Sequence, residues 1–341
     1  MIRDAIRKIV ERQNLTAEEA EMAMSEIMDG EATPAQVASF ITALRMKGET
    51  IDEITAFTGV MRQRAVKVVT EREPLVDTCG TGGDKLDTFN ISTAASFVAA
   101  GAGVAVAKHG NRAASSNCGS ADVLEALGVN LTMTPEQIGK CIDCVGIGFM
   151  FAPSMHPAMK HAVGPRKEIG VRTVFNILGP MTNPAGAKAQ VLGVFSVDLC
   201  EVMARVLKNL GSERAIVAHG MDGLDEISTL GKTRISELKD GVVRGYDLDP
   251  GEMGLPKARA QDIAGGQTLE ENVEILMAVL QGEKGPRRDI VCLNAAAALV
   301  VAGKAEDLRQ GFGMAKKEID SGAALDCLER FRDFSRECAA T

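Results

Sequence analysis

Aromatic residues are scarce in this sequence. Its 341 residues include no tryptophan and one tyrosine, and aromatic residues make up 4% of the chain. A core must therefore be built from Ala, Val, Leu, Ile and Met, and a hydrophobic content of 45% is ample for it. The length suits about two domains of ordinary size.

The sequence also lacks an excess of positive charge and a long apolar run. Its formal net charge of −8 argues against a nucleic-acid partner, which needs a basic face, although a small anionic substrate needs only a local basic site. The most apolar late stretch, Val291 to Ala302, is too short to span a bilayer and contains Asn294, so we expect no membrane partner. Eight cysteines without a secretory signal predict reduced thiols and a cytoplasmic location.

Several catalytic motifs are absent. Gly80, Gly82 and Gly83 have neither the dinucleotide-binding spacing nor a following Gly-Lys-Ser/Thr, which argues against hydride transfer and ATP hydrolysis. No Gly-x-Ser-x-Gly elbow supplies a nucleophile. Cys141 and Cys144 form a Cys-x-x-Cys pair, but zinc needs two more ligands and no second pair exists. We interpret this pair as part of a packed helix.

The first 70 residues have the pattern of helices. Apolar residues from Ile2 to Val10 recur at helical spacing. Thr16 to Glu19 and Thr50 to Glu53 match the capping box, in which a hydroxyl and a carboxylate satisfy free N–H groups reciprocally. Thr33-Pro34 places proline at a first helical position. The pattern predicts about four helices that pack together and carry no chemistry.

From residue 74 onward, short apolar runs alternate with helical segments. Strands are predicted at 74–76, 104–107, 147–151, 191–195, 215–218 and 233–238, and helices at 92–100, 121–127, from 134, and near 199–210. The chain is helical again from about residue 270. This alternation predicts a mainly parallel α/β sheet covered on both faces, with ligands at the carboxyl ends of its strands.

The stretch from Asp77 to Thr93 is the strongest candidate for a ligand site. Glycine allows backbone N–H groups to approach a ligand and to take positive φ. Ser92 and Thr93 are good N-cap residues for the following helix, whose N-terminus favours an anion. The pattern indicates a phosphate cradle, although glycine turns also occur for purely structural reasons.

The loop from Lys108 to Ser120 follows the next strand. It combines two cations and His109 with two amides and several serines and glycines, a mixture that suits a polyanion. A polar surface loop is the alternative.

The loop from His219 to Ser228 places Asp222, Asp225 and Glu226 within five residues. These carboxylates repel one another unless a cation is present, and Mg²⁺ is commonly bound by one or two carboxylates together with phosphate oxygens. Taken alone, this loop fits a solvated acidic turn better.

The stretch from Phe149 to Arg166 is the fourth candidate loop. It sets apolar residues beside His156, Lys160, His161 and Arg166. Apolar walls and one guanidinium suit an aromatic or apolar acid. The two histidines fit a structural role better than a catalytic one.

Together these stretches resemble the anthranilate phosphoribosyltransferase family. The motifs that carry the resemblance are Asp77-Thr-Cys-Gly-Thr-Gly-Gly-Asp84 with Asn90-Ile-Ser-Thr93, Lys108-His-Gly-Asn-Arg112, Gly119-Ser-Ala-Asp122, Phe151-Ala-Pro with His156-Pro-Ala-Met-Lys160, Arg172-Thr-Val-Phe-Asn-Ile-Leu-Gly-Pro180 with Thr182-Asn-Pro184, and Asp222-Gly-Leu-Asp-Glu226. They occur in the family's order. One departure is Asn117, where relatives often carry a basic residue, and it is expected to weaken one phosphate contact.

The resemblance implies a fold like that of the nucleoside phosphorylases. A small helical domain, residues 1–70, would take back a segment near 170–185, a larger α/β domain would span 74–341, and the protein would be a homodimer. The reaction would transfer the 5-phosphoribosyl group of phosphoribosyl pyrophosphate to the amine of anthranilate, with Mg²⁺ as cofactor, in tryptophan biosynthesis.

The resemblance also assigns residues to roles. Phosphoribosyl pyrophosphate would contact Gly80, Gly83, Asp84, Thr88, Asn90, Ile91, Ser92, Thr93, Lys108, Asn111, Ser116 and Ser120. Anthranilate would contact Gly80, His109, Asn111, Arg166 and Pro180, and magnesium would contact Ser92, Asp225 and Glu226. Lys108, Asn111 and Arg166 would be the catalytic residues.

Two rivals share the implied fold. A pyrimidine nucleoside phosphorylase is expected to have a glycine-rich Lys-His-Ser pattern in place of Lys108-His-Gly-Asn-Arg112. A non-enzymatic, nucleic-acid-binding member is expected to show a basic groove and to lack the pair Asp225 and Glu226.

Overall fold

The N-terminal region is a group of helices that begin at capped ends. The computed structural model describes residues 1–83, 86–113 and 118–339. Its first elements are α1 (Ile2–Val10), α2 (Ala17–Met28), α3 (Pro34–Lys47) and α4 (Ile51–Arg64). The predicted capping boxes at Thr16 and Thr50 are both formed, and Pro34 is the first residue of α3. These helices are therefore specified by local signals that the sequence shows directly.

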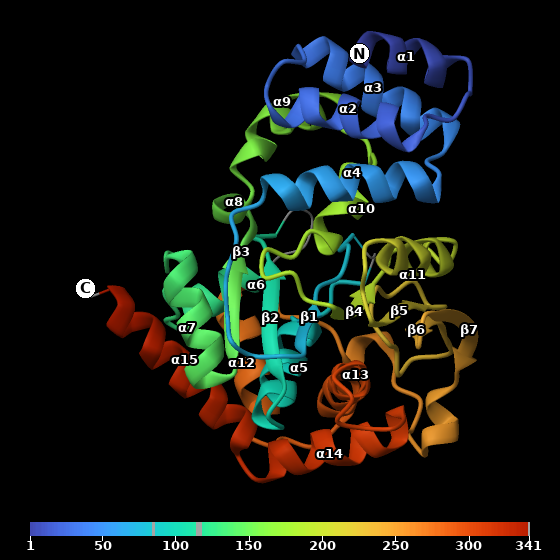
Figure 1. Ribbon diagram of the computed structural model, residues 1–341. Helices are drawn as coiled ribbons and strands as arrows, with labels where there is room; N and C mark the ends of the chain where they lie inside the picture. The colour runs from blue at the N-terminus through green and yellow to red at the C-terminus, as the bar shows by residue number, and fades with distance from the viewer. Residues whose placement is uncertain (84–85, 114–117, 340–341) are drawn as a thin grey trace.

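A later segment of the chain returns to these helices. It consists of α8 (Ala152–Met155), η1 (Pro157–Met159), α9 (Lys160–Ile169), α10 (Phe175–Leu178) and η2 (Gly179–Met181). Helix α9 packs against α2 and α3, and α10 contacts α4 (Figure 1). Much of the stretch 149–166, which we expected to be a loop, is therefore helical. Ala162 joins the cluster of the N-terminal helices, with Ala158 and Met159 packed against it, and Pro165 is accommodated inside α9.

One mixed sheet forms the centre of the rest of the molecule. Its strands are β1 (Leu75–Thr78), β2 (Ala105–Gly110), β3 (Ile147–Phe151), β4 (Ala189–Gly193), β5 (Arg214–Gly220), β6 (Thr233–Lys239) and β7 (Val242–Leu248). Their order is β3-β2-β1-β4-β5-β6-β7, with β1 to β5 parallel and the last two pairs antiparallel. The prediction of a mainly parallel sheet is confirmed.

Several details of the strand prediction were wrong. Strand β2 continues to Gly110, so Lys108 and His109, which we expected in the following loop, lie within the strand. Strand β7 was not predicted, because it lies at the edge of the sheet and most of its residues are exposed, so its sequence lacks a buried apolar run. The fourth strand ends at Gly193 and not at Phe195. Beyond Gly193 the chain binds the glycine-rich loop, since the Phe195 N–H donates to Thr81 Oγ1 at 3.1 Å.

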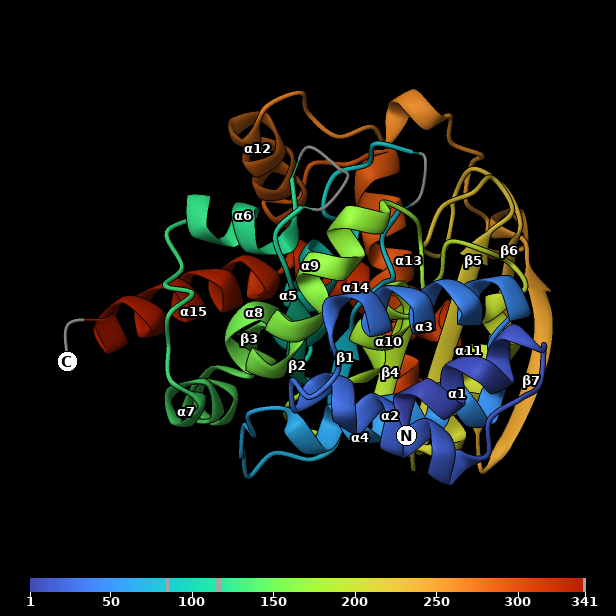
Figure 2. The same cartoon turned by 90° about the horizontal axis from the view of Figure 1, so that it is seen from above.

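Helices cover both faces of the sheet (Figures 1 and 2). They are α5 (Ile91–Gly101), α6 (Ser120–Ala126), α7 (Pro135–Val145), α11 (Leu199–Asn209), α12 (Leu269–Leu280), α13 (Pro286–Val301), α14 (Leu308–Asp320) and α15 (Ala323–Ala339), with η3 (Pro250–Met253) and η4 (Ala260–Asp262) in a connection. Along β5, Ala215 and Val217 join the cluster of the N-terminal helices, whereas Ile216 joins the opposite cluster, as the alternation of a strand requires.

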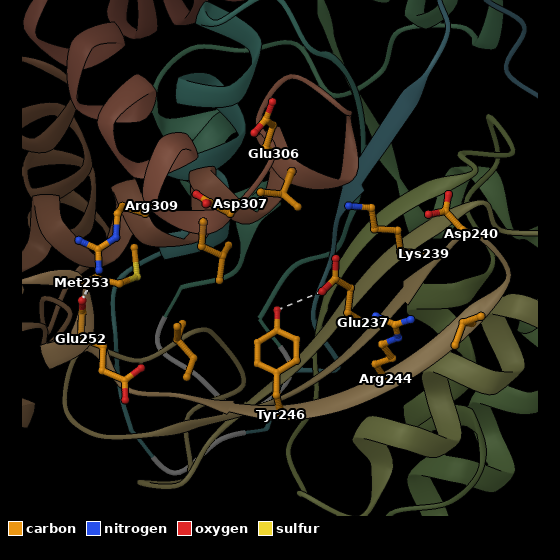
Figure 3. A pocket seen from close by; sticks show the side chains of 14 residues that line it. Glu237, Lys239, Asp240, Arg244, Tyr246, Glu252, Met253, Glu306, Asp307 and Arg309 are labelled. Carbon is orange, nitrogen blue, oxygen red and sulfur yellow. Dashed lines mark hydrogen bonds between the residues drawn. The ribbon is translucent and has the colours of Figure 1, made fainter.

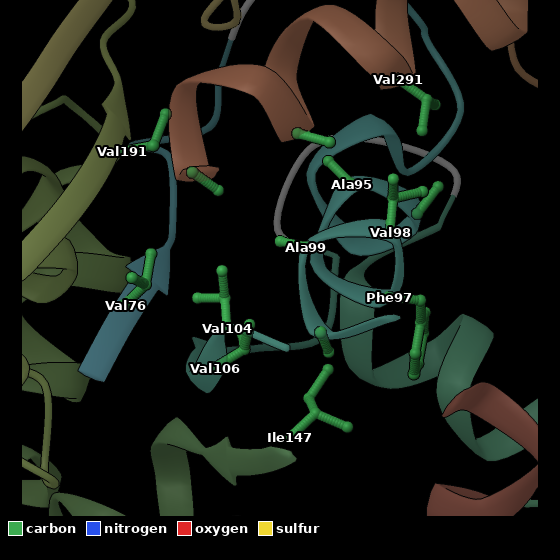
Figure 4. Close-up of a cluster of buried hydrophobic side chains, with 14 of the residues drawn as sticks. Val76, Ala95, Phe97, Val98, Ala99, Val104, Val106, Ile147, Val191 and Val291 are labelled. Carbon is green, nitrogen blue, oxygen red and sulfur yellow. The ribbon is translucent and has the colours of Figure 1, made fainter. Parts of the chain in front are cut away.

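The second cluster contains the two most buried helices. Helix α5 packs against β2, β3 and α13, and Val98, Val106 and Ile147 are among the residues of this cluster (Figure 4). Helix α13 is buried along nearly its whole length and includes one buried asparagine, Asn294. Small Ala and Val side chains dominate here, as the scarcity of aromatic residues predicted.

Strand β1 has β2 on one side and β4 on the other. The chain leaves β1 toward β2 and β3 and later crosses to β4. Such a switch point opens a crevice at the carboxyl ends of the central strands, where ligands bind in open α/β sheets.

Candidate functional site

Four polar segments follow the strands at this crevice. The glycine-rich loop comes after β1, Lys108 and His109 end β2, Gly193 ends β4, and the acidic loop comes after β5. The topology thus brings together the first three candidate stretches of the sequence.

The glycine-rich loop is tied to the acidic loop and to β4. The Gly82 N–H donates to Asp225 Oδ2 at 2.7 Å, and the Thr81 N–H donates to the Gly193 carbonyl at 2.9 Å. Gly82 has a φ of 65°, which favours glycine. A Cβ atom on Gly80 would lie 2.8 Å from Asp225 Oδ2. Glycine is therefore needed here for backbone conformation and for the close approach of a carboxylate.

Arg172 holds the far end of the same loop. Its guanidinium donates to the Gly83 carbonyl and lies over the Phe195 ring, 4.4 Å from the ring centroid. A Cβ atom on Gly83 would meet Arg172 Nη2 at 2.5 Å. Sequence reasoning assigned Arg172 no role, and its place in a family motif was the only signal.

Lys108 is a buried cation whose hydrogen bonds go to neutral oxygen atoms. Its Nζ donates to the Thr78 carbonyl at 2.7 Å, to Thr78 Oγ1 at 3.3 Å and to Ser92 Oγ at 3.4 Å, and the residue is 3% exposed. No carboxylate forms an ion pair with it within the described ranges. Burial lowers the pKa of the Lys108 ammonium. A buried, unpaired cation at this edge is poised to bind an anion.

The start of α5 differs from the prediction. Asn90 is the N-cap residue, and Ser92 and Thr93 lie inside the first turn. The Asn90 side chain makes no capping bond, and its Nδ2 donates to the Cys118 carbonyl at 3.1 Å. Asn90 Oδ1 and Thr93 Oγ1 are buried without a hydrogen-bond partner among the described residues. These oxygen atoms fit donors of a ligand at the N-terminus of α5.

Asp77 joins three segments beneath the site. Its Oδ1 accepts the His109 N–H at 3.2 Å, and its Oδ2 accepts Asn183 Nδ2 at 2.8 Å. The same Asn183 amide donates to the Ala107 carbonyl at 2.8 Å. Burial raises the pKa of Asp77 to about 6. This network fixes the end of β2, on which both Lys108 and His109 are carried.

Two histidine rings lie together beside this network. The His109 and His156 rings have centroids 5.0 Å apart, and both residues are at least nine-tenths buried. Burial lowers the pKa of His109 to about 3 and that of His156 to about 4. His156 Nε2 lies 3.4 Å from Thr182 Oγ1. Both rings are therefore neutral at pH 7 and form a wall, not an acid catalyst.

Arg166 lies on α9, in the segment that returns to the N-terminal helices. Its guanidinium lies over the Phe175 ring at 5.2 Å and has no ion pair in the part of the chain that the structure describes. Burial lowers its pKa. Pro180 is buried in the same segment, where its carbonyl accepts Gln190 Nε2 at 2.7 Å. Arg166 thus offers a free guanidinium beside an aromatic ring.

Asn111 and Ser120 contact each other at the mouth of the second loop. Ser120 Oγ donates to the Asn111 carbonyl at 3.3 Å, and Asn111 Oδ1 accepts the Arg112 N–H at 2.8 Å. Arg112 itself pairs with Asp122 and Glu125, each at 2.8 Å. One of the two cations that we expected to attract a polyanion is therefore engaged by carboxylates.

The acidic loop supplies two carboxylates toward the crevice and one to itself. Asp222 accepts the Leu224 N–H at 3.2 Å and Ser228 Oγ at 2.6 Å, so it braces the loop internally. Burial raises the pKa of Asp225, and the charge of Glu226 acts on Lys108. No group of three His, Cys, Asp or Glu side chains suited to a metal occurs in residues 1–83, 86–113 and 118–339. The donor set fits Mg²⁺, which needs few carboxylates when phosphate supplies the other oxygens.

The remaining predicted residues are two at the start of α5 or before it, three outside the described residues and the Cys-x-x-Cys pair. Thr88 forms an isolated bridge with Ala264, and Ile91 is buried at the start of α5. Asp84, Ser116 and Asn117 lie outside the described residues. Cys141 is buried and Cys144 exposed on α7, and both are free thiols.

A separate surface hollow lies far along the sheet, at its β6–β7 edge. Its volume is about 580 Å³, and it shares no residue with the candidate site. Figure 3 shows Glu306, Asp307 and Arg309 on one side and Lys239, Asp240 and Arg244 on the other. Tyr246 donates to Glu237 Oε2 at 3.2 Å within it. Most of the charged residues around it are exposed to solvent, which is typical of a surface groove.

Comparison with known proteins defines the class. A profile described as the helical bundle domain of a glycosyl transferase family matches residues 3–65, and one described as the a/b domain of that family matches residues 72–325. The anthranilate phosphoribosyltransferase of Acetivibrio thermocellus is 56% identical over 335 residues, or 98% of this chain and 97% of the relative. That of Symbiobacterium thermophilum is also 56% identical and covers 98% of each chain.

Solved structures agree with these sequence matches. The anthranilate phosphoribosyltransferase of Thermus thermophilus has a TM-score of 0.93 at 47% identity and covers 98% of this chain and 99% of its own. The Saccharomyces cerevisiae protein in complex with PRPP and Mg has a TM-score of 0.90 at 28% identity, with 98% of both chains covered. The protein is thus a glycosyl transferase with a helical bundle and an α/β domain. Within that class, the chain belongs to the anthranilate phosphoribosyltransferase family.

Proposed function

We propose that this protein transfers the 5-phosphoribosyl group of phosphoribosyl pyrophosphate to the amine of anthranilate and releases pyrophosphate, as a step in tryptophan biosynthesis. The observation that carries the proposal is Lys108, a buried cation without an ion pair among the described residues, between the glycine-rich loop and α5. An anion bound there would pair with the Lys108 ammonium, whose hydrogen bonds all go to neutral oxygen atoms.

The reaction needs little covalent chemistry from the protein. The bond from ribose C1 to the pyrophosphate oxygen breaks, a bond from C1 to the anthranilate nitrogen forms, and the nitrogen loses a proton. An aromatic amine is neutral near pH 7, so it needs no base before attack. This explains why the chain needs no nucleophile and why positioning and electrostatic stabilisation suffice.

The phosphate side would bind the leaving group. Lys108 would bind a pyrophosphate oxygen, and the glycine-rich loop would supply N–H groups. The unpartnered oxygens of Asn90 and Thr93 would accept hydroxyl protons of the ribose. Ser92, Asp225 and Glu226 would hold Mg²⁺, which, when bound, would neutralise charge on the leaving pyrophosphate. Gly80, Gly83, Thr88, Ile91 and Ser120 would complete this side.

The acceptor side would bind anthranilate. The free guanidinium of Arg166 would pair with its carboxylate, and Pro180 and the neutral His109 ring would contact its benzene ring. Asn111 stands at the mouth of the second loop, where its amide would orient the amine. These roles agree with the apolar walls and single guanidinium predicted from the sequence.

Three broader features belong to the same proposal. We place the helical domain at residues 1–70 with a returning segment near 170–185, and the α/β domain at 74–341. The packing of α10 on α4 supports the returning segment, and the packing of α9 on α2 and α3 extends it back to Lys160. The thiol state of buried cysteines such as Cys141, Cys200 and Cys292 supports a cytoplasmic location, and no helix in the described part of the chain is long and apolar enough to cross a membrane. We also propose a homodimer.

One assay tests the activity. Purified protein is mixed with anthranilate, phosphoribosyl pyrophosphate and Mg²⁺, and loss of anthranilate fluorescence is followed. We expect the fluorescence to fall only when all components are present and pyrophosphate to appear in equal amount. No fluorescence loss, together with release of a free base from a pyrimidine nucleoside and phosphate, would identify a nucleoside phosphorylase instead.

A further inference from the structure

A buried asparagine of α13 contacts the acidic loop. Asn294 lies in α13, is 3% exposed and is surrounded by Ala, Leu and Val along that helix. Its Oδ1 accepts the Ile227 N–H at 2.9 Å, and its Nδ2 donates to the Ile227 carbonyl at 2.9 Å. The same Nδ2 donates to the Ile290 carbonyl at 2.9 Å. One side chain thus binds both backbone polar groups of the residue that follows Glu226.

The acidic loop is also in contact with β4 and with the glycine-rich loop. A Cβ atom on Gly193 would lie 1.5 Å from the Asp225 carbonyl oxygen, so the backbone of β4 and that of the loop are in direct contact. Asp225 is also bound to the Gly82 N–H. The two carboxylates therefore lie on a short backbone segment fixed by Gly193 on one side and by Asn294 on the other.

We propose that Asn294 is a positioning residue for the magnesium-binding loop, because its amide clamps the backbone directly after Asp225 and Glu226. This inference rests on the proposed function, in which these two carboxylates hold the metal. Buried amides in an apolar helix cost free energy unless every polar atom is paired, and here each is paired. Residues that orient metal ligands without touching the metal are worth about 10- to 100-fold in metal affinity.

The chain offers a matched control in Asn272. It is also 3% exposed, and its amide binds the Gly266 N–H at 3.2 Å, the Gly266 carbonyl at 3.1 Å and the Thr268 carbonyl at 2.8 Å. Asn272 therefore clamps a loop in the same way as Asn294. That loop, residues 264–267, carries neither of the two carboxylates.

The test measures Mn²⁺ binding by electron paramagnetic resonance at saturating pyrophosphate, where no turnover occurs. Asn294→Leu is expected to raise the Kd for Mn²⁺ about tenfold, Asn294→Ser is expected to raise it less, and Asn272→Leu is expected to lower the melting temperature without changing the Kd. If Asn294→Leu does not fold, Asn294→Ser carries the test. With phosphoribosyl pyrophosphate and anthranilate present, raised Mg²⁺ is expected to restore kcat in the Asn294 variants only.

A third variant, Asp225→Asn with Glu226→Gln, separates the inference from the function on which it rests. If this variant loses Mn²⁺ but both Asn294 variants bind it like the wild type, the carboxylates hold the metal and Asn294 has only a structural role, which overturns the inference alone. If the double variant binds Mn²⁺ normally, the metal assignment and the inference both fail. Equal weakening in the Asn294 and Asn272 variants would also overturn the inference, because it would reflect stability alone.

Discussion

The two sides of the candidate site are built in different ways. On the phosphate side, loops from β1, β4 and β5 are joined by hydrogen bonds that backbone N–H groups donate, from Gly82 to the Asp225 carboxylate and from Thr81 to the Gly193 carbonyl. On the acceptor side, the Arg166 guanidinium lies over the Phe175 ring and the His109 ring lies beside the His156 ring. A fixed array of donors and charges suits an anion whose charge grows during the reaction, whereas an apolar wall with one guanidinium suits recognition. Changes to the first side should therefore lower kcat, and changes to the second should raise KM.

Substitutions in the acidic loop are expected to have the largest effect on kcat. Asp225→Asn with Glu226→Gln should lower kcat by about 100-fold or more, since several kcal/mol of charge stabilisation is lost. Asparagine keeps an oxygen for the Gly82 N–H, so the melting temperature should stay nearly unchanged. Raised Mg²⁺ should restore part of the rate by mass action. Near-normal turnover at low Mg²⁺ would show that this loop is only an acidic turn.

A substitution of Lys108 tests whether the phosphate side contains a buried charge that lowers stability but is needed for catalysis. Lys108→Met should lower kcat about 100-fold or more through loss of a buried cation from the leaving-group site. The melting temperature should stay the same or rise, because a buried charge without a carboxylate partner costs desolvation energy that methionine avoids. Steady-state kinetics and thermal unfolding of the same preparation give both values. A variant that is less stable but fully active would assign Lys108 to the structure and not to the site.

Arg166 tests the acceptor side. Arg166→Ala should raise the KM for anthranilate about 10- to 100-fold, since a hydrogen bond to a charged group contributes about 1.5–3 kcal/mol. The KM for phosphoribosyl pyrophosphate should change little. Lys167→Ala is the control, because this neighbour on α9 is exposed. Equal increases in both KM values would mean that Arg166 does not distinguish the two sides.

The parts that sequence reasoning predicted well are those specified locally. The capping boxes at Thr16 and Thr50 each span four residues of sequence, and they predicted where α2 and α4 begin. The glycine-rich loop was recognised from its composition. The N-terminus of α5 was misplaced by two residues, since the local preference of Ser92 did not reveal that the Asn90 side chain binds Cys118, 28 residues away.

The contacts that join the site are non-local, and no periodicity reveals them. Gly82 and Asp225 are 143 residues apart, Gly83 and Arg172 are 89 apart, and Ile227 and Asn294 are 67 apart. The first and last pairs meet because the strand order is β1-β4-β5 and α13 packs against these strands, whereas Arg172 reaches Gly83 from the segment between α9 and α10. Asn294 was visible in the sequence as a polar residue in an apolar helix, but its partner was not.

The smallest expected effect concerns the buried histidines of the acceptor side, and it is seen in stability. The pKa of His156 is lowered to about 4 by burial and by the charge of Lys67, whereas an unfolded histidine titrates near 6.5. The unfolded chain therefore binds a proton that the folded chain refuses, so stability is lost as the pH falls below 6.5. Between pH 6.5 and 5 this group removes about 2 kcal/mol from the free energy of unfolding.

His156→Gln should remove that loss, because glutamine keeps a polar group near Thr182 but cannot be protonated. Denaturant unfolding at pH 7 and pH 5 should show a smaller decrease for the variant than for the wild type. The comparison must be made between variants, since His109 acts in the same direction and Asp77, whose pKa is raised to about 6, acts in the opposite one. Asp77 takes up its proton more readily when folded and so stabilises the protein toward acid pH. Identical decreases in wild type and variant would mean that His156 has the same pKa in the folded and unfolded chains, so that burial does not keep its ring neutral and the acceptor side would carry a charged ring at pH 5.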